Sequence, residues 1–187
     1  DIFCSGADLD ELHQITYNES QSEKMTIDMS TKIGHLLNLI DAIPKLTVSV
    51  IEGPCIAGGF GMACATDVII TMHNSVFRLS ETRLGLTPSQ IAPYVLRKVD
   101  YSKARLLMLL GDSIDGKIAH DIGLADYLAT TEKEVRNHID QIKSKLNKCS
   151  PNAFAITKSL VSKHASINIQ KAAELFSECV EHNEGKE

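Results

Sequence analysis

The first clear pattern of apolar and polar positions is a helical one, over residues 24–43. Apolar residues recur there at intervals of three or four, which places them on one face of a helix. They are Met25, Met29, Ile33, Leu36, Leu37 and Ile40. Pro44 follows and predicts the end of the helix. Upstream, residues 8–13 predict a short helix, and the polar residues 14–23 predict a mobile loop.

Shorter apolar runs predict strands in the next part of the chain. Residues 2–4 look like the tail of a strand, and residues 46–53 are rich in β-branched side chains. Residues 68–72 are almost wholly apolar, as is typical of a buried parallel strand. Residues 75–81 alternate, which puts Phe77 on the face opposite Arg78.

Helical patterns dominate from residue 89 onward. A brief strand is predicted at residues 125–129, and Thr131 is a candidate N-cap for the helix after it. The helices are predicted over residues 101–110, 115–121, 132–146, 154–163 and 169–180. Strand, glycine turn, short helix and strand, followed by a helical layer, predict the α/β class with right-handed crossovers. We divide the chain into a core, residues 1–125, and a helical region, residues 126–187.

Composition narrows the possible partners. The 187 residues carry a net charge of −5 without a block of Lys or Arg, which argues against nucleic acid or a membrane surface as a partner. Five scattered cysteines predict free thiols in a reducing, cytoplasmic setting, and no His or Cys pair has metal-ligand spacing. The chain starts without Met and within a strand pattern, so we expect a piece of a longer protein.

A glycine-rich stretch, GPCIAGGFGMACATD, lies between a predicted strand and a predicted helix at residues 53–67. Backbone N–H groups at such a turn lack intrahelical partners and favour negative charge. They fit a phosphate cradle or an oxyanion hole, or the glycines only permit close packing. The phosphate interpretation is weak, because no Lys follows the glycines and Gly58-Gly59-Phe60-Gly61 is not G-x-G-x-x-G.

A second glycine turn, FCSGADL, precedes another predicted helix, and an acid, Glu81, follows further along. In this order and spacing, FCSGADLDEL, VSVIEGPCIAGGFGMACATDVII and VFRLSETRLGLTPSQIAPYVLRKV resemble the crotonase (enoyl-CoA hydratase/isomerase) superfamily. LSETRLGLTPSQIAPYV is most similar to the methylglutaconyl- or isohexenylglutaconyl-CoA hydratase type. The resemblance implies a ββα superhelix with its N-terminal part missing, and a C-terminal helical region that forms a homotrimer or homohexamer.

The resemblance also implies a site for an acyl-CoA thioester, with no cofactor apart from the coenzyme A of the substrate and no metal. The amides of Ala7 and Gly58 would bind the thioester oxygen, and Glu81 would transfer protons. Asp8 would order its loop. The substrate-binding positions implied are Ser5, Asp8, Gly59, Gly61, Phe77, Pro88 and Ser89.

Two departures from the family pattern leave the reaction open. Gly61 stands where hydratases of the family carry a second glutamate, so Glu81 alone suits an isomerase, whereas the branch resemblance favours a hydratase. A non-catalytic acyl-CoA-binding homologue is the third alternative. Ser89 and Gln90 replace a glycine-rich turn and offer hydrogen bonds, or are merely surface residues. Arg78 and Arg83 would meet a second substrate carboxylate, or are solvated.

Overall fold

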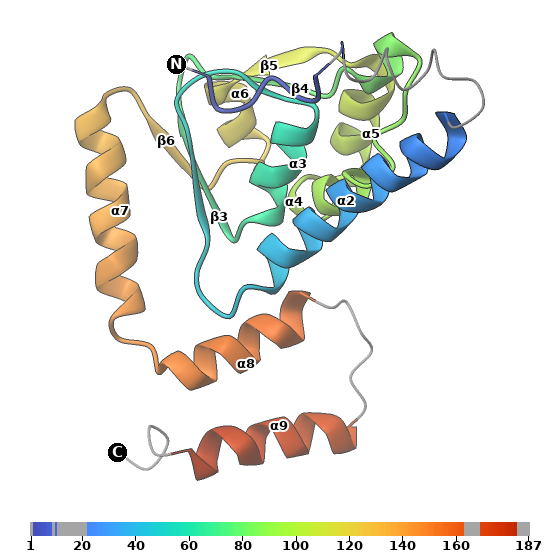
Figure 1. The fold of residues 1–187 in the computed structure, drawn as a ribbon. Coiled ribbons are helices and arrows are strands. Elements are labelled where there is room, and N and C mark those ends of the chain that lie inside the picture. Colours follow the sequence, from blue (N-terminus) through green and yellow to red (C-terminus); the bar gives the residue numbers. More distant parts are fainter. Residues whose placement is uncertain (1, 9, 11–21, 163–168, 183–187) are drawn as a thin grey trace.

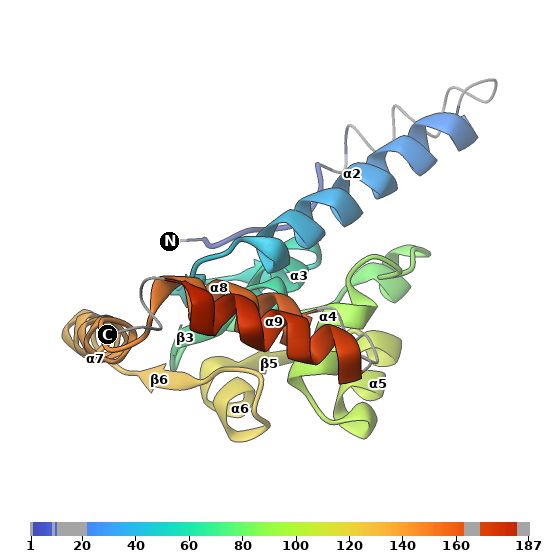
Figure 2. The ribbon, with the colours of Figure 1, turned by 90° about the horizontal axis from the view of Figure 1, so that it is seen from below.

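The structure is a computed structural model that describes residues 2–8, 10, 22–162 and 169–182. Most of the predicted loop at residues 14–23 and of the predicted helix at residues 8–13 lies outside the described residues, and the last two loop positions instead begin a helix. The first described helix is α2, Ser22–Ala42, which confirms the helix predicted before Pro44. Leu37 on this helix is fully buried, whereas Ile27 is 59% exposed. The N-terminal turns of α2 extend past the rest of the molecule (Figure 2).

Three parallel strands form one sheet in the order β1-β3-β6. β1 is Val48–Ile51, β3 is Val68–Met72 and β6 is Tyr127–Ala129. The helix α3, Gly58–Ala65, lies in the connection from β1 to β3 (Figure 1). Because β6 pairs with β3, this sheet extends past the predicted domain boundary at residue 125.

A second sheet has the order β2-β4-β5 and includes two strands that the apolar pattern did not reveal. β2 is Cys55–Ile56, β4 is Val76–Arg78 and β5 is Ser113–Asp115. β2 pairs with β4 in parallel, and β5 pairs with β4 in the antiparallel direction. Cys4 forms a parallel bridge with Cys55, so the N-terminal segment adds to the β2 edge.

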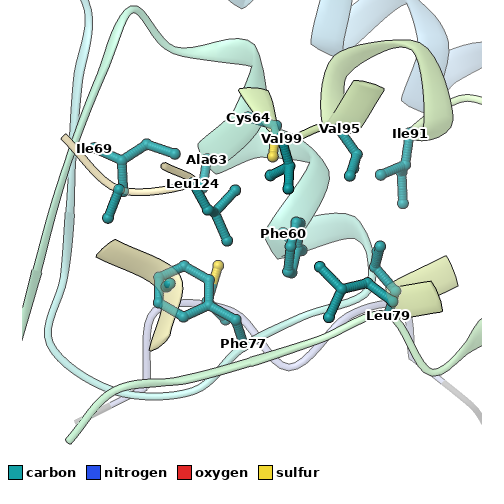
Figure 3. Close-up of a cluster of buried hydrophobic side chains, with 14 of the residues drawn as sticks. Phe60, Ala63, Cys64, Ile69, Phe77, Leu79, Ile91, Val95, Val99 and Leu124 are labelled. Atoms are coloured by element: carbon teal, nitrogen blue, oxygen red, sulfur yellow. The ribbon is translucent and has the colours of Figure 1, made fainter. Parts of the chain in front are cut away.

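The larger core lies where α3 packs between the second sheet and α4. Figure 3 shows side chains from α3, β3, β4 and α4 pointing toward one another. Phe60 and Phe77 meet edge to face, with ring centroids 5.7 Å apart, a geometry that aromatic pairs favour. Cys55 and Cys64 are buried free thiols, and burial raises the pKa of Cys64 to about 12. These two cysteines therefore behave as small apolar core residues.

Helices make up most of the remaining described chain. They include a short 3₁₀ helix η1, Glu81–Leu84, which begins at the candidate acid. The Thr131 hydroxyl accepts a hydrogen bond from the Glu134 amide at 3.3 Å, which confirms the predicted N-cap. Among the described residues, no helix is both long and apolar enough to cross a membrane. The other helices are α4 Ala92–Lys98, α5 Tyr101–Leu110, α6 Gly116–Asp121, α7 Glu132–Leu146, α8 Pro151–Ser162 and α9 Ile169–Glu181.

Candidate active site

Three chain segments run in parallel and end at one edge of the second sheet. Cys4 lies opposite Cys55, and Cys55 lies opposite Phe77. The Ile56 amide donates to the Cys4 carbonyl at 2.8 Å, which holds the first two segments together. By the same register Gly6 lies opposite Ala57, so Ala7 follows beside the turn into α3, and Glu81 begins η1 just after β4. Carboxyl ends of adjacent parallel strands commonly carry a binding site.

A backbone contact supports this register near the site. A Cβ atom added to Gly6 would lie 3.1 Å from the Ala57 Cβ, so these two turns touch. Gly6 has φ 98°, a conformation that glycine adopts without strain. The two glycine-containing turns predicted from the sequence are therefore neighbours in space.

Ala57 turns the chain sharply from β2 into α3. Its backbone has φ 49° and ψ −116°, and it is the sole non-glycine residue with positive φ among the described residues. Its amide donates to the Arg78 carbonyl at 2.9 Å, and its carbonyl accepts from the Gly61 amide at 3.2 Å. Strained backbone of this kind persists only where its surroundings hold it. Ala57 is therefore the residue at which the strand ends, and α3 begins at the next residue, Gly58.

The amides of Ala7 and Gly58 have no hydrogen-bond acceptor within the described part of the chain. Ala7 is exposed, and no heavy atom lies within 4 Å of a Cβ built on Gly58. The Gly58 amide also lies at a helix N-terminus, where partial positive charge accumulates.

Glu81 is a buried acid without a partner for one of its oxygens. Glu81 is only 8% exposed, and its Oε2 atom is buried without a hydrogen bond among the described residues. Burial raises the pKa of the Glu81 carboxyl, and a hydrogen bond from its own backbone N–H opposes part of this shift. A carboxyl of this kind is suited to proton transfer near neutral pH.

Two glycines expected to contact substrate are packed closely on the side where a side chain would stand. A Cβ on Gly61 would lie 2.7 Å from Cγ1 of Ile91, so the space beside Gly61 holds this side chain. A Cβ on Gly59 would lie 2.6 Å from the Cys4 Cβ. Neither position therefore has room for a larger residue, and the contact of their backbone with substrate stays a prediction.

The prediction that Phe77 binds substrate is wrong, because this residue is fully buried against Phe60 in the core. Its alternation with Arg78 is as predicted, but the apolar face of β4 packs on α3 and is closed to a ligand. Ser5 and Asp8 are exposed on the N-terminal segment. The Asp8 carboxylate accepts a hydrogen bond from the Asp10 amide at 2.9 Å.

The two arginines that flank Glu81 bind the end of α5. Nε of Arg78 donates to the Gly111 carbonyl at 3.0 Å, and Nε of Arg83 donates to the Leu110 carbonyl at 2.7 Å. Arg83 also forms an ion pair with Asp112. Both arginines thus satisfy carbonyls that a helix C-terminus leaves free, although Arg83 is also exposed to solvent as the second interpretation expected. The residue of the sequence that marks this helix end is Gly111, the C-cap of α5.

Pro88 and Ser89 line a cavity of about 340 Å³ beside η1. The cavity wall begins with Thr82, the residue after Glu81, and also includes Tyr101 and Arg105 of α5. No local sequence pattern singles out either α5 residue, because only the packing of α5 on η1 brings them here. Gln90 does not join this group, since its Nε2 donates to the Ser30 hydroxyl at 3.3 Å in another cavity.

In the part of the chain that the structure describes, no group of three or more His, Cys, Asp or Glu side chains could hold a metal ion. The candidate site thus consists of two amides, one buried acid and a neighbouring cavity.

Known proteins are similar to this chain in sequence and in fold. The family model described as enoyl-CoA hydratase/isomerase matches residues 1–187. The chain is 31% identical to an enoyl-CoA hydratase, ACTT6, of Alternaria alternata over 181 residues, covering 95% of this chain and 58% of that protein. It thus spans little more than half the length of this curated relative.

Two solved structures are similar over nearly the whole chain. The structure of Pseudomonas aeruginosa AtuE is 32% identical with a TM-score of 0.90, covering 99% of this chain and 72% of that one. An enoyl-CoA hydratase/isomerase from Marinobacter aquaeolei is 29% identical with a TM-score of 0.89, at the same coverages of 99% and 72%.

Proposed function

Because the chain belongs to the enoyl-CoA hydratase/isomerase family, we propose that it carries the oxyanion hole and the acid/base group of an enzyme that acts on acyl-CoA thioesters. The observation that supports this most directly is the buried Glu81 carboxyl, one oxygen of which has no hydrogen-bond partner among the described residues, just after β4, the strand that pairs with β2. We assign the oxyanion hole to the amides of Ala7 and Gly58 and the acid/base role to Glu81.

The amides suit the charge that thioester chemistry creates. When a thioester loses an α-proton, or gains a nucleophile at its β-carbon, negative charge moves to the thioester oxygen. Two fixed N–H donors stabilise that enolate, and the loss of one such donor costs roughly 3–4 kcal/mol in comparable sites. The strained turn at Ala57 fixes the direction of the Gly58 amide before substrate arrives.

Hydration is the reaction that we assign first. Water adds its oxygen to the β-carbon of an enoyl thioester and loses one proton to the Glu81 carboxylate. The protonated Glu81 then delivers a proton to the α-carbon of the enolate, so Glu81 ends as it began. The expected substrate is a methylglutaconyl- or isohexenylglutaconyl-type thioester, handled by a homotrimer or homohexamer.

Isomerisation through Glu81 alone is the second candidate, and one observation favours it. Ile91 occupies the space beside Gly61, where a second carboxylate would otherwise stand. A 1,3-proton shift needs a single shuttle, which removes a proton from one carbon and returns it to another. With no second acid at this position, Glu81 alone would remove the proton from one carbon and return it to the other.

The test compares Glu81→Gln with a control, Glu52→Gln, in the protein that contains this chain. Glu52 is exposed, so its substitution should leave turnover unchanged. Glu81→Gln should lower kcat by about 10²–10⁴-fold on a panel of 2-enoyl- and 3-enoyl-CoA thioesters, because proton transfer typically contributes that much. Incorporation of labelled water identifies hydration, and double-bond migration without it identifies isomerisation. Undiminished turnover by Glu81→Gln would rule out both reactions as written.

A further inference from the structure

We propose that Arg78 and Arg83 are positioning residues for the candidate acid, because they hold the chain on both sides of Glu81 against the C-terminal end of α5. This inference rests on the proposed function and adds to it two residues that do not touch the reacting atoms. It is carried by the way the Glu81 carboxyl is held, by the bonds that fix the backbone around it, and by the link from Arg78 to the turn at Ala57.

The Glu81 carboxyl is not aimed by any other side chain that the structure describes. Its Oε2 has no hydrogen-bond partner among the described residues, and the carboxyl is bonded by the backbone N–H of Glu81 itself. The place of the carboxyl therefore follows the place of the backbone at the start of η1. Because a catalytic group must be held within about 0.5 Å of its productive geometry, the contacts that fix η1 decide how well this acid can act.

Two arginines fix that backbone from both sides of the acid. Before Glu81, Nε of Arg78 donates to the Gly111 carbonyl at 3.0 Å. After Glu81, Nε of Arg83 donates to the Leu110 carbonyl at 2.7 Å. Both acceptors lie at the C-terminal end of α5, where carbonyls lack partners within the helix. The end of α5 thus offers fixed acceptors to which the segment that carries the acid is attached.

The approach of η1 to the end of α5 is close. The Thr82 hydroxyl donates to the Met108 carbonyl at 3.3 Å, which adds a third bond between the two elements. A Cβ on Gly111 would lie 2.9 Å from the Leu79 carbonyl oxygen and 3.2 Å from Nε of Arg83. Gly111 also has φ 61°, so a glycine at this point permits both the turn and the contact. The bonds from the arginines are therefore part of a packed contact between the two elements.

Arg78 also connects the acid to the proposed oxyanion hole. Its backbone carbonyl accepts a hydrogen bond from the Ala57 amide at 2.9 Å, and Ala57 leads directly into Gly58. Glu81 follows Arg78 by three residues. Arg78 thus binds α5 through its side chain and the turn at Ala57 through its backbone. A shift of this residue would change the distance between the Gly58 amide and the acid as well as the direction of the carboxyl.

The experiment measures kcat and KM in the protein that contains this chain, with the enoyl-CoA thioester that the wild-type protein turns over fastest. Arg78→Met and Arg83→Met should each lower kcat by about tenfold with little change in KM, because small displacements of a reacting group are costly. Arg78→Lys should retain most of the activity, since Lys can donate to the same carbonyl. The control is Arg136→Met, which removes an arginine bonded to Glu132 on α7 at 3.2 Å and should leave kcat unchanged.

A double-mutant cycle with Glu81→Gln separates positioning from a general loss of stability. In the Glu81→Gln background, Arg78→Met should lower kcat by less than about twofold, because residues that act through one group are not additive with its removal. The pKa of the Glu81 carboxyl, followed by NMR titration, should fall toward 4.5 in Arg78→Met, since a loosened η1 admits water to the carboxyl. A bond with a structural role alone would lower only the melting temperature.

The outcomes distinguish this inference from the proposed function. Wild-type kcat in both Arg→Met variants would overturn the inference, and so would an additive cycle with an unchanged pKa of Glu81. In either case the proposed function still stands if Glu81→Gln loses turnover. Full turnover by Glu81→Gln would instead overturn the proposed function, and the arginines would then have no catalytic acid to position. Lowered kcat with a non-additive cycle and a lowered pKa would support both.

Discussion

Two buried charged residues of this protein contrast sharply in how their polar atoms are satisfied. Lys158 on α8 is 5% exposed, and its ammonium donates to the Asp67 carboxylate at 2.6 Å and to the Lys45 carbonyl at 2.9 Å. Glu81 is 8% exposed, yet Oε2 has no hydrogen-bond partner among the described residues. The first region is an anchor between α8 and the β1–β3 sheet, and the second is the candidate site.

The difference in hydrogen bonding distinguishes a buried charge that holds the structure together from a buried charge that serves a function. An ion pair with satisfied hydrogen bonds holds two elements in register, and the Asp67 carboxylate also accepts from the Thr47 amide at 2.7 Å. An acid with an unsatisfied oxygen costs stability, so the fold keeps it only where it serves another purpose. Four predictions test this contrast, from the largest effect on stability to the smallest.

The largest effect should follow from removing the anchor, with Lys158→Met. The change leaves the Asp67 carboxylate partly buried without its cation, and breaking such a pair costs about 3 kcal/mol or more. Thermal unfolding should then shift down by roughly 6–12 °C for a chain of this size.

A double-mutant cycle with Asp67→Asn isolates the anchor pair itself. Lys158→Met combined with Asp67→Asn should destabilise the protein by clearly less than the sum of the single changes, because the two groups contact each other. Additive changes would show that the pair has no special role and would remove the contrast with Glu81.

The second prediction concerns the filled space under the site, where Gly61 meets Ile91. Gly61→Ala should destabilise the protein by about 1–2 kcal/mol, since the new methyl group would overlap Cγ1 of Ile91. In an Ile91→Ala background the same Gly61→Ala change should cost almost nothing, because the overlapping atoms are gone. Chemical denaturation measures all four proteins, and an equal cost in both backgrounds would contradict the close contact.

The third prediction is a substitution that increases stability, whereas most substitutions decrease it. Ala57→Gly should stabilise the protein by about 1 kcal/mol or slightly less, because glycine adopts positive φ without strain but also has more freedom when unfolded. The same change should lower kcat, because the Gly58 amide is then held less firmly. A gain in stability with unchanged kcat would show that this strain does not serve the oxyanion hole.

Local chemistry made much of the fold predictable from the sequence. The helix over residues 101–110 and the strand over residues 68–72 were predicted with the bounds that the structure has. Gly111 has φ 61° and ends the helix as a left-handed C-cap. β2 and β5 were missed because strands of two and three residues are too short to show a period.

The candidate site was predictable only in part, since its parts meet through long-range packing. Glu81 and the turns at Ala7 and Gly58 were predicted from the resemblance, whereas hydropathy alone marks Glu81 as an ordinary surface acid. Nothing local shows that Ile91 fills the space beside Gly61, or that Phe77 faces α3 and not a ligand.

The smallest expected effect on stability belongs to Glu81→Gln, and its pH dependence completes the contrast with Lys158. Burial raises the pKa of the Glu81 carboxyl above its ordinary value of 4.5, so the folded protein binds this proton more tightly than the unfolded chain. Below pH 4.5 the group is protonated in both states. As the pH rises from there through the folded pKa, the wild-type protein loses stability that Glu81→Gln retains. The variant should therefore be more stable at pH 8, by about 1 kcal/mol or less, and equal to wild type at pH 4. Thermal unfolding at both pH values measures this difference, and a pH-independent difference would show that ionised Glu81 finds a partner after all.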